Sequence, residues 1–223
     1  MSIELKKRIV TSIILSILLI IIVFSHIGIF TISTFIVSYF IYNEVSLINY
    51  RILKNKAFIL NIINIFYIFG VFLPSAIVLY KLTNPLFILY VLLVCISSDI
   101  GGYFIGKNIG GAKLTKISPN KTISGSLGSF FFSFLPLLIF VTLNNHDYYY
   151  SINNFLFCLQ ISLVCQLGDL FISHLKRKAK VKDTGKILPG HGGLLDRIDG
   201  IIFAIPFTYF YVTDINDYFK YLF

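Results

Sequence analysis

Long apolar runs separated by short polar segments dominate this chain. Runs such as "IILSILLIIIVF" do not alternate in polarity, as the strands of a membrane barrel would, so each is predicted to be a helix that satisfies its own backbone hydrogen bonds in lipid. About 20 apolar residues are needed to cross the hydrocarbon core. The pattern therefore predicts an all-α, polytopic transmembrane protein with about seven spans (six to eight). The runs cover residues 9–24, 27–42, 57–73, 75–98, 127–143, 154–172 and 200–213.

Composition and charge support this prediction and orient the chain. Of the 223 residues, 57% are hydrophobic and 13% are charged, against roughly a quarter charged in soluble domains. With the N-terminus in the cytoplasm, nearly all of the 19 Lys and Arg residues fall in cytoplasmic segments, as the positive-inside rule requires. Segment 144–153 has none and is expected to face outward. The basic start and first apolar run resemble a signal peptide, but a second run follows at once, which favours a retained span.

Two polar segments are longer than orientation requires. Residues 99–126 and 173–199 are rich in Gly, Ser and charge, and both are predicted to be cytoplasmic. The net charge of +9 reflects topology for the most part, but it also fits an anionic partner such as a lipid headgroup or a nucleotide phosphate. We expect one integral-membrane domain over 1–223, with N-terminal spans in 1–98 and a catalytic half in 99–223.

Asp169 is the most informative acidic residue, because it interrupts an apolar helix. An ionised side chain is costly there and is usually functional, although a capping or salt-bridged aspartate is the alternative. Ser173 and Lys176 follow at i+4 and i+7, on the same helical face. An acid and a base therefore line one stripe that leads into segment 173–199.

Segment 173–199 combines metal-binding and phosphate-binding residue types. Carboxylates without His/Cys pairs are typical of Mg²⁺ rather than Zn²⁺ sites. "LPGHGG" (188–193) is a glycine-rich turn whose N–H groups can form an anion nest. Together these features predict phosphoryl or nucleotidyl transfer. The candidate metal ligands are Asp169, Asp183, Asp196 and Asp199, and the candidate phosphate partners are Lys176, Arg177, Lys182 and Arg197.

Segment 99–126 offers further candidates. Asp99, Ser118 and Lys121 are plausible contacts for a nucleotide, whereas the glycines of 101–106 fit equally well as helix-packing positions. "GGYFIGKN" imitates a phosphate-binding P-loop, but the Ser or Thr that should follow the lysine is absent. His191 is a candidate proton shuttle, although a structural or phosphate-contacting role is favoured, because a phosphate monoester nucleophile is already largely ionised at pH 7.

The segment "SHLKRKAKVKDTGKILPGHGGLLDRID" (173–199) resembles the signature of bacterial phosphatidate cytidylyltransferases (CDP-diacylglycerol synthases). "GDLF" (168–171), "DIGGYFIGK" (99–107) and "ISPNKT" (117–122) also resemble blocks of this family. The matching signature residues are Ser173, Lys176, Arg177, Lys182, Asp183, Gly185, Pro189, His191, Gly192, Gly193, Asp196, Arg197 and Asp199. Relatives often carry Glu where this chain has Ser124 and Ile172, which weakens any metal or nucleotide role at those two positions.

The resemblance implies a nucleotidyltransferase that converts CTP and phosphatidate to CDP-diacylglycerol and pyrophosphate for phospholipid synthesis. It implies Mg²⁺, with a possible second cation, on a centre formed by Asp169 and Asp196. It also implies a homodimer in the cell (inner) membrane, with a cytoplasmic active site, membrane lipid as a partner and no nucleic acid. Catalytic roles would fall to Asp169, Asp196, Lys182, Asp183 and Arg197, and substrate contacts to Asp99, Ser118, Lys121, Ser173, Lys176, Arg177, His191, Gly192 and Gly193.

Three other functions are alternatives to this one. A CTP-dependent lipid kinase would also place CTP beside a lipid. A CDP-alcohol phosphotransferase needs a run of Asp, Gly and Arg on helices that the sequence does not contain. A transporter, with Asp169 as an ion site, predicts inverted repeats, and none is evident.

Overall fold

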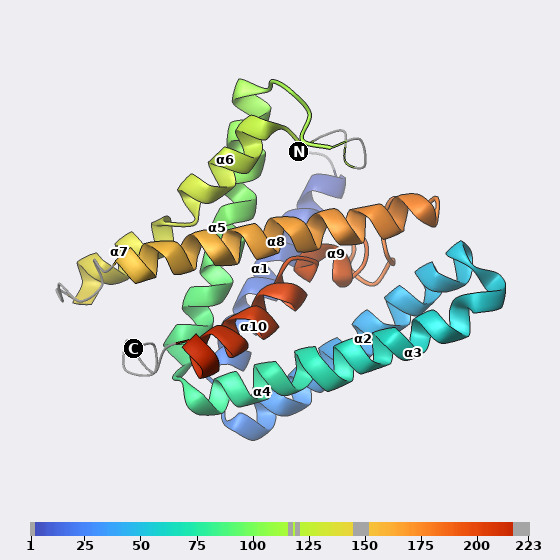
Figure 1. Cartoon of the computed structure of the whole chain (residues 1–223), viewed down its shortest axis with the longest axis horizontal. Coiled ribbons are helices and arrows are strands. Elements are labelled where there is room, and N and C mark those ends of the chain that lie inside the picture. The colour runs from blue at the N-terminus through green and yellow to red at the C-terminus, as the bar shows by residue number, and fades with distance from the viewer. Residues whose placement is uncertain (1–2, 116–117, 119–120, 145–151, 216–223) are drawn as a thin grey trace. The chain divides into compact units, whose positions relative to one another are not determined.

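The computed structural model describes residues 3–115, 118, 121–144 and 152–215. Within these ranges the chain is helical apart from short loops and contains no β-strand, which confirms the all-α prediction (Figure 1). Residues 145–151 of the predicted outward segment 144–153 lie outside the described residues, and so do residues 216–223. The cytoplasmic placement of the N-terminus stays a prediction.

Each apolar run forms a helix or a pair of consecutive helices. Within the described ranges, five helical stretches are long and apolar enough to cross a membrane, so the chain is a multi-pass membrane protein. They are Ile27–Ile52 (α2), Ala57–Leu82 (α3, a π-helical turn and α4), Pro85–Ile109 (α5), Ile123–Phe140 (α6 and the start of α7) and Ile152–Lys178 (α8). Helix α1 (Ile3–Val23) begins with charged residues, and the apolar helix Ile201–Thr213 is shorter. The count of about seven spans stays a prediction.

Two predicted boundaries differ from the structure. The third and fourth runs separate at Thr83–Asn84 rather than near residue 74, because Pro85 disfavours helical geometry in the residue before it and then starts α5 (Pro85–Ile109). Both polar segments are also partly helical. Helix α5 continues to Ile109 and α8 to Lys178, since the spans need not end where their charged residues begin.

The chain divides into two compact units, which are described separately. The first contains Met1–Pro85 and Leu175–Asp199, and the second contains Leu86–His174 and Gly200–Phe223. The expected organisation, one domain over 1–223 with a catalytic half in 99–223, stays a prediction. Helix α8 contributes to both units, because its last turn belongs to the first.

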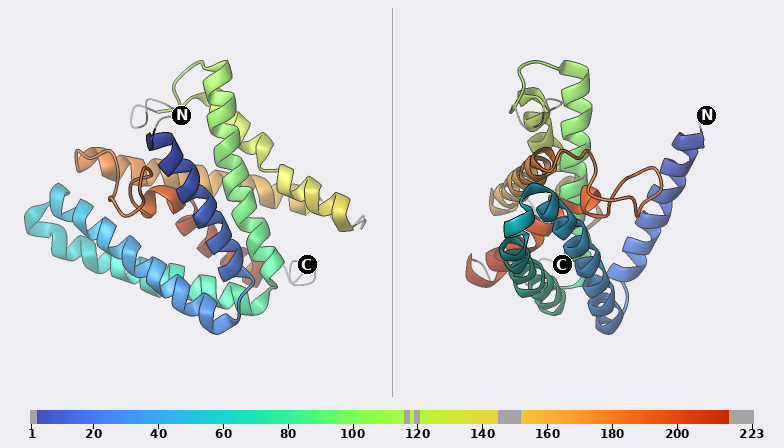
Figure 2. Two further views of the ribbon diagram at one scale, coloured as in Figure 1. Left: turned by 180° about the vertical axis from the view of Figure 1, so that it is seen from behind. Right: turned by 90° about the vertical axis from the view of Figure 1, so that its right-hand side faces the viewer.

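In the first unit, α2 lies antiparallel beside the continuous helix of α3 (Ala57–Tyr67) and α4 (Leu73–Leu82), as Figures 1 and 2 show. The Asn49 amide donates a hydrogen bond to Asn61 at 2.9 Å across this pair, and Phe30 stacks on Tyr80. Ile41, Ile48 and Leu79 are almost completely buried. The signature segment also packs on α2, through the short helix α9 (Leu195–Ile198).

In the second unit, aromatic side chains form the core between α5, α7 (Leu135–Asn144), α8 and the helix Ile201–Thr213. Phe157 of α8 stacks on Phe87 of α5 and also contacts Tyr211. A polar contact lies within this core, where the hydroxyls of Ser98 and Ser162 are 2.7 Å apart. These contacts hold α5 and α8 together, and the two helices carry the acids Asp99 and Asp169, respectively.

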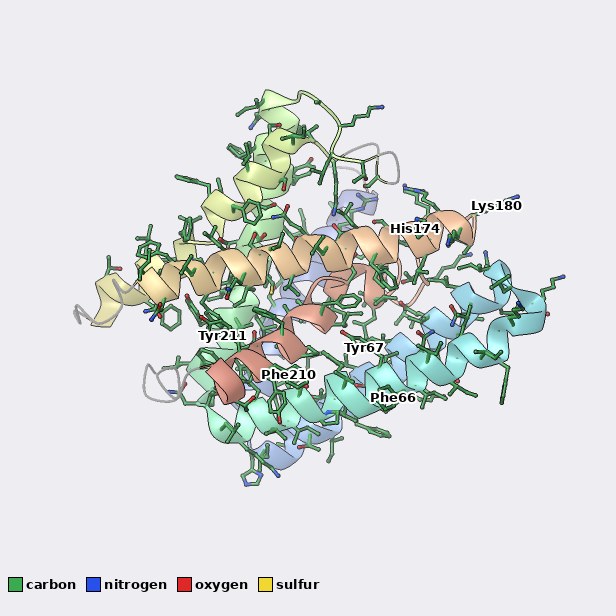
Figure 3. All side chains as sticks on the ribbon, viewed as in Figure 1. Phe66, Tyr67, His174, Lys180, Phe210 and Tyr211 are labelled. Atoms are coloured by element: carbon green, nitrogen blue, oxygen red, sulfur yellow. The ribbon has the colours of Figure 1, made fainter. Side chains whose placement is uncertain are left out.

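Large apolar side chains also cover the outside of the helices. Phe58 is 76% exposed and Phe66 is 71% exposed, and Figure 3 shows Phe66 directed away from its helix. Exposed apolar surface on this scale is unusual for a soluble protein and is expected for helices that face lipid. The pattern agrees with the membrane assignment.

Candidate active site

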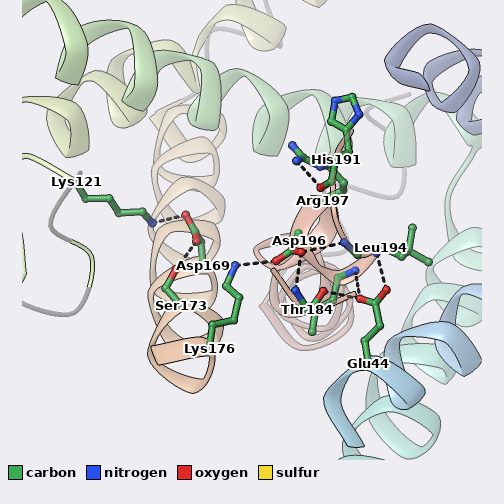
Figure 4. A network of polar contacts seen from close by, with 12 residues as sticks. Glu44, Lys121, Asp169, Ser173, Lys176, Thr184, His191, Leu194, Asp196 and Arg197 are labelled. Carbon is green, nitrogen blue, oxygen red and sulfur yellow. Dashed lines mark hydrogen bonds and ion pairs between the residues drawn. The ribbon is translucent and has the colours of Figure 1, made fainter. Parts of the chain in front are cut away.

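Asp169 is the centre of a polar cluster in the second unit. It is half-buried on α8, accepts a hydrogen bond from the Ser173 hydroxyl at 3.2 Å and forms an ion pair with Lys121 (Figure 4). Asp99 of α5 interacts electrostatically with both Asp169 and Lys121. The structure therefore brings together Asp99, Lys121 and Asp169, which the sequence places in separate segments.

The backbone around Lys121 forms an isolated antiparallel bridge, between Lys113 and Thr122, and a turn. The N–H of Leu114 donates to the Lys121 carbonyl at 2.8 Å across the bridge, and the N–H of Lys121 donates to the Ser118 carbonyl at 3.0 Å in the turn. The next residue, Thr122, is the N-cap of α6 (Ile123–Phe132), because its hydroxyl accepts the N–H of Gly125 at 3.0 Å. This bridge, the turn and the cap position Lys121 at the start of a helix.

The glycines of 101–106 are helix-packing positions, which was one of the two interpretations that the sequence allowed. A Cβ added at Gly101 would lie 2.5 Å from the Gly128 carbonyl oxygen, and one at Gly128 would lie 2.8 Å from the Gly101 carbonyl oxygen. Helices α5 and α6 approach so closely that only glycine fits at these two positions. The contact holds the Lys121 loop, at the start of α6, near α5.

Asp196 is the centre of a second polar cluster, which lies in the first unit. Its Oδ1 accepts a hydrogen bond from Lys176 at 2.8 Å, and its Oδ2 accepts the N–H groups of Thr184 at 2.8 Å and Gly193 at 3.0 Å (Figure 4). Burial alone would raise the pKa of Asp196. The hydrogen bonds from Lys176, Thr184 and Gly193 outweigh burial, so the pKa is lowered and the side chain is ionised at neutral pH.

The turn at 188–193 is a tight hairpin that Gly190 and Gly192 make possible, because both have positive φ. The N–H groups of His191 and Gly192 donate to the Leu188 carbonyl, and Gly193 donates to Asp196. The predicted anion nest is therefore already occupied by acceptors of the chain itself. A substrate phosphate would have to displace them to bind these backbone groups.

His191 has the surroundings of a neutral histidine. Its Nε2 lies 3.2 Å from the Ser12 hydroxyl, and its carbonyl accepts a hydrogen bond from Arg197 at 2.8 Å. Burial, together with the positive charges of Arg197 and Arg8, lowers the pKa of His191 below its ordinary value. A ring that is neutral at pH 7 offers a phosphate a hydrogen bond rather than a charge.

Four other residues of the signature segment were predicted to bind metal or phosphate, and they differ in position and exposure. Asp183 lies beside Asp196, since a Cβ on Gly192 would be 3.1 Å from the Asp183 Cβ and 2.9 Å from Asp196 Oδ2. Arg177 and Lys182 are exposed, and Asp199 is the C-cap residue that follows α9.

The two positions at which relatives often carry Glu have structural roles here. Ile172 is buried in α8, with 2% of its surface exposed. Ser124 bonds to the Gly110 carbonyl and to the Thr122 hydroxyl at the start of α6. Neither residue supplies a carboxylate to the site.

Sequence reasoning missed Glu44 and Thr184. Glu44 is 2% exposed on α2 and accepts the Thr184 hydroxyl at 2.6 Å. The signal that identified Asp169 applies equally to Glu44, because an acid inside a membrane helix is costly unless it is bonded. The second apolar run was predicted to end at residue 42, which placed Glu44 outside the span, whereas α2 continues to Ile52.

Both acid clusters have the donor chemistry of a hard-cation site. No group of three or more His, Cys, Asp or Glu that could hold a metal occurs in the described part of the chain. Each cluster instead pairs a central aspartate with a lysine ammonium, Lys121 on Asp169 and Lys176 on Asp196. Mg²⁺ typically binds one or two carboxylates and completes its shell with water and substrate phosphates, so these donors fit it.

Comparison with known proteins identifies the family of the chain. The Cytidylyltransferase family model matches residues 6–214. A phosphatidate cytidylyltransferase of Bacillus subtilis is 46% identical over 125 residues, which is 56% of this chain and 46% of the relative. One of Rickettsia bellii is 40% identical over 153 residues, 62% of this chain and 64% of the relative, and one of Helicobacter pylori is 40% identical over 126 residues, 56% and 46%.

A polytopic helical membrane protein with lysine–carboxylate clusters is the class that the fold and the site define. Because the family match extends over most of its length, the chain belongs to the Cytidylyltransferase family. It spans about half to two thirds of the length of the curated relatives it matches.

Proposed function

We propose that this protein is a phosphatidate cytidylyltransferase, which transfers CMP from CTP to phosphatidate and gives CDP-diacylglycerol and pyrophosphate. The observation that carries the proposal is the folded signature, in which Lys176, Thr184 and Gly193 surround an ionised Asp196. The similarity to phosphatidate cytidylyltransferases supports the same reaction. The proposed location is the cell (inner) membrane, with the site on its cytoplasmic side.

In the proposed reaction, a phosphate oxygen of phosphatidate bonds to the α-phosphorus of CTP, and the bond from that phosphorus to the β-phosphate oxygen breaks to release pyrophosphate. The acyl chains hold phosphatidate in the membrane, so only its headgroup must reach the site. Such transfer depends mainly on positioning and on neutralising phosphate charge.

The chain's own cations supply much of that neutralisation. Lys176, Arg177, Lys182 and Arg197 are proposed to bind phosphates, the arginines through bidentate contacts and the lysines as point charges. Ser118, Lys121 and Asp99 are proposed to contact CTP. Asp183 is proposed to support the cation or to orient a lysine.

Mg²⁺ is the proposed cofactor, with Asp169 and Asp196 as the carboxylates that the family resemblance assigns to it. When bound, it would neutralise negative charge on the phosphates. A second cation and a homodimer are further expectations from the resemblance.

The decisive experiment is an assay in membranes with CTP labelled at the α-phosphate, with and without Mg²⁺. Nucleotidyl transfer places the label in the lipid product, whereas a CTP-dependent lipid kinase leaves the lipid unlabelled. The proposal fails if phosphatidate acquires no α-label. The Mg²⁺ assignment fails if Asp169→Asn and Asp196→Asn, expressed normally in membranes, both keep wild-type turnover.

A further inference from the structure

Glu44 is a buried carboxylate that binds the signature segment from a distant part of the chain. Its Oε2 accepts the Thr184 hydroxyl at 2.6 Å and the N–H of Leu195 at 2.9 Å, and its Oε1 accepts the N–H of Leu194 at 2.8 Å. Only 2% of Glu44 is exposed. All three donors are neutral groups, so this carboxylate is held by directed hydrogen bonds, which strongly constrain the positions of the donors.

Glu44 and Asp196 bind the same stretch of backbone. The N–H of Thr184 donates to Asp196 while its hydroxyl donates to Glu44. The next donors are divided in the same way, since the N–H of Gly193 goes to Asp196 and those of Leu194 and Leu195 go to Glu44. A displacement of Glu44 would therefore move the groups that orient Asp196.

Two glycines of the signature make room for this carboxylate. A Cβ added at Gly185 would lie 2.7 Å from Glu44 Oε1, and one at Gly193 would lie 2.7 Å from the same oxygen. Any side chain at these two positions would push Glu44 away from its donors.

We propose that Glu44 is a positioning residue, which acts through Thr184 and the backbone of 193–195 to fix the Asp196 carboxylate against Lys176. The kinetic part of this inference rests on the proposed function, whereas the structural part does not. Glu44 is not proposed to contact the substrates. Its role is to limit the orientations that Asp196 can adopt.

The test compares Glu44→Gln and Thr184→Val with the wild-type protein, purified in detergent as folded material. Glutamine replaces one acceptor oxygen with a donor that faces other donors, and valine removes only the hydroxyl. Two quantities are measured, which are amide hydrogen exchange over residues 184–195 and the kinetics of α-labelled CTP transfer. We expect exchange in this segment to rise about tenfold and kcat to fall about tenfold or more, with KM for CTP changed less than about threefold.

Matched variants separate positioning from general destabilisation. Thr184→Ser keeps the hydroxyl and is expected to restore both exchange protection and kcat. Asn49→Ala removes another buried polar contact of α2, the one to Asn61, and is expected to lower the unfolding temperature while kcat per folded molecule stays at the wild-type value. If Glu44→Gln does not fold, the Thr184→Val and Thr184→Ser pair decides.

The outcomes are distinguishable. Wild-type kcat and wild-type exchange in both Glu44→Gln and Thr184→Val overturn the inference, and so does a loss of stability without any change in kcat of the folded enzyme. If the wild-type protein transfers no CMP but exchange over 184–195 rises as expected, the proposed function fails while the role of Glu44 in holding Asp196 stands.

Discussion

The Lys176 ammonium donates a hydrogen bond to the Asp196 carboxylate at 2.8 Å, and both side chains are largely buried, with 14% and 6% of their surfaces exposed. Breaking such a pair by removing one partner typically costs about 3 kcal/mol or more, because a buried charge loses its counter-charge. The pair joins the last turn of α8 to α9, two elements that the signature places 20 residues apart.

Lys176→Met is expected to lower turnover by about 100-fold, since it removes both a phosphate-binding cation and the partner of Asp196. The measurement is CMP transfer from CTP in membranes, normalised to the amount of protein. Lys178→Met is the matched control, because Lys178 is an exposed lysine in the same helical turn, and it is expected to retain activity. Equal turnover of the Lys176→Met and Lys178→Met variants would contradict the role of Lys176.

Lys121→Met is expected to raise KM for CTP about tenfold or more, because a charge-assisted contact contributes roughly 1.5–3 kcal/mol. The ion pair with Asp169 would be lost in the same variant. Steady-state kinetics with varied CTP measure the effect. Lys113→Met serves as the control, because Lys113 is an exposed lysine of the same loop. If the KM of Lys113→Met rises as much as that of Lys121→Met, the effect is a general loss of positive charge and not the loss of a specific contact.

The contribution of Asp196 to stability has a defined pH dependence. The folded protein lowers its pKa below the ordinary value of 3.8, so the ionised form stabilises the fold at every pH above that value. This stabilisation is lost as pH falls below about 3.8 and through the lowered pKa. The difference in unfolding temperature between the wild type and Asp196→Asn is therefore expected to be constant between pH 8 and about 5 and to shrink only below about 4. A difference that already vanishes between pH 7 and 5 would show that the carboxylate is not held in this way.

Gly128→Ala is expected to destabilise the protein by roughly 1–3 kcal/mol, because the new Cβ would lie 2.8 Å from the Gly101 carbonyl oxygen and force α5 and α6 apart. Thermal unfolding in detergent measures the change. Gly70→Ala is the control, since a Cβ there meets nothing closer than 3.6 Å, and it is expected to be neutral or slightly stabilising. Similar losses in both variants would contradict close packing of α5 against α6 as the cause, because alanine has the higher helix propensity at both positions.

Much of the site could be predicted because its residues are close in sequence or repeat with the period of a helix. Ser173 follows Asp169 by one turn, and the structure shows the hydrogen bond that this spacing suggests. Asp183 and Asp196 lie together within one signature. The hydrogen bonding of the glycine-rich turn could not be predicted in this way. The sequence does not show which acceptors its backbone N–H groups bind, and those acceptors are brought into place only when the segment folds.

By itself, the sequence determined the helical membrane class and the residues of the signature, because apolar run length and local spacing act over a few turns of chain. Only the tertiary structure decided which acceptors bind the N–H groups of the turn at 188–193 and which glycines pack α5 against α6. It also decided that Glu44 lies beside the signature segment. Glu44 and Thr184 are 140 residues apart, and no local pattern specifies their hydrogen bond. That bond forms because α2 extends past residue 42 and the signature segment packs on it. This packing buries Glu44, and a buried carboxylate is costly unless it accepts hydrogen bonds.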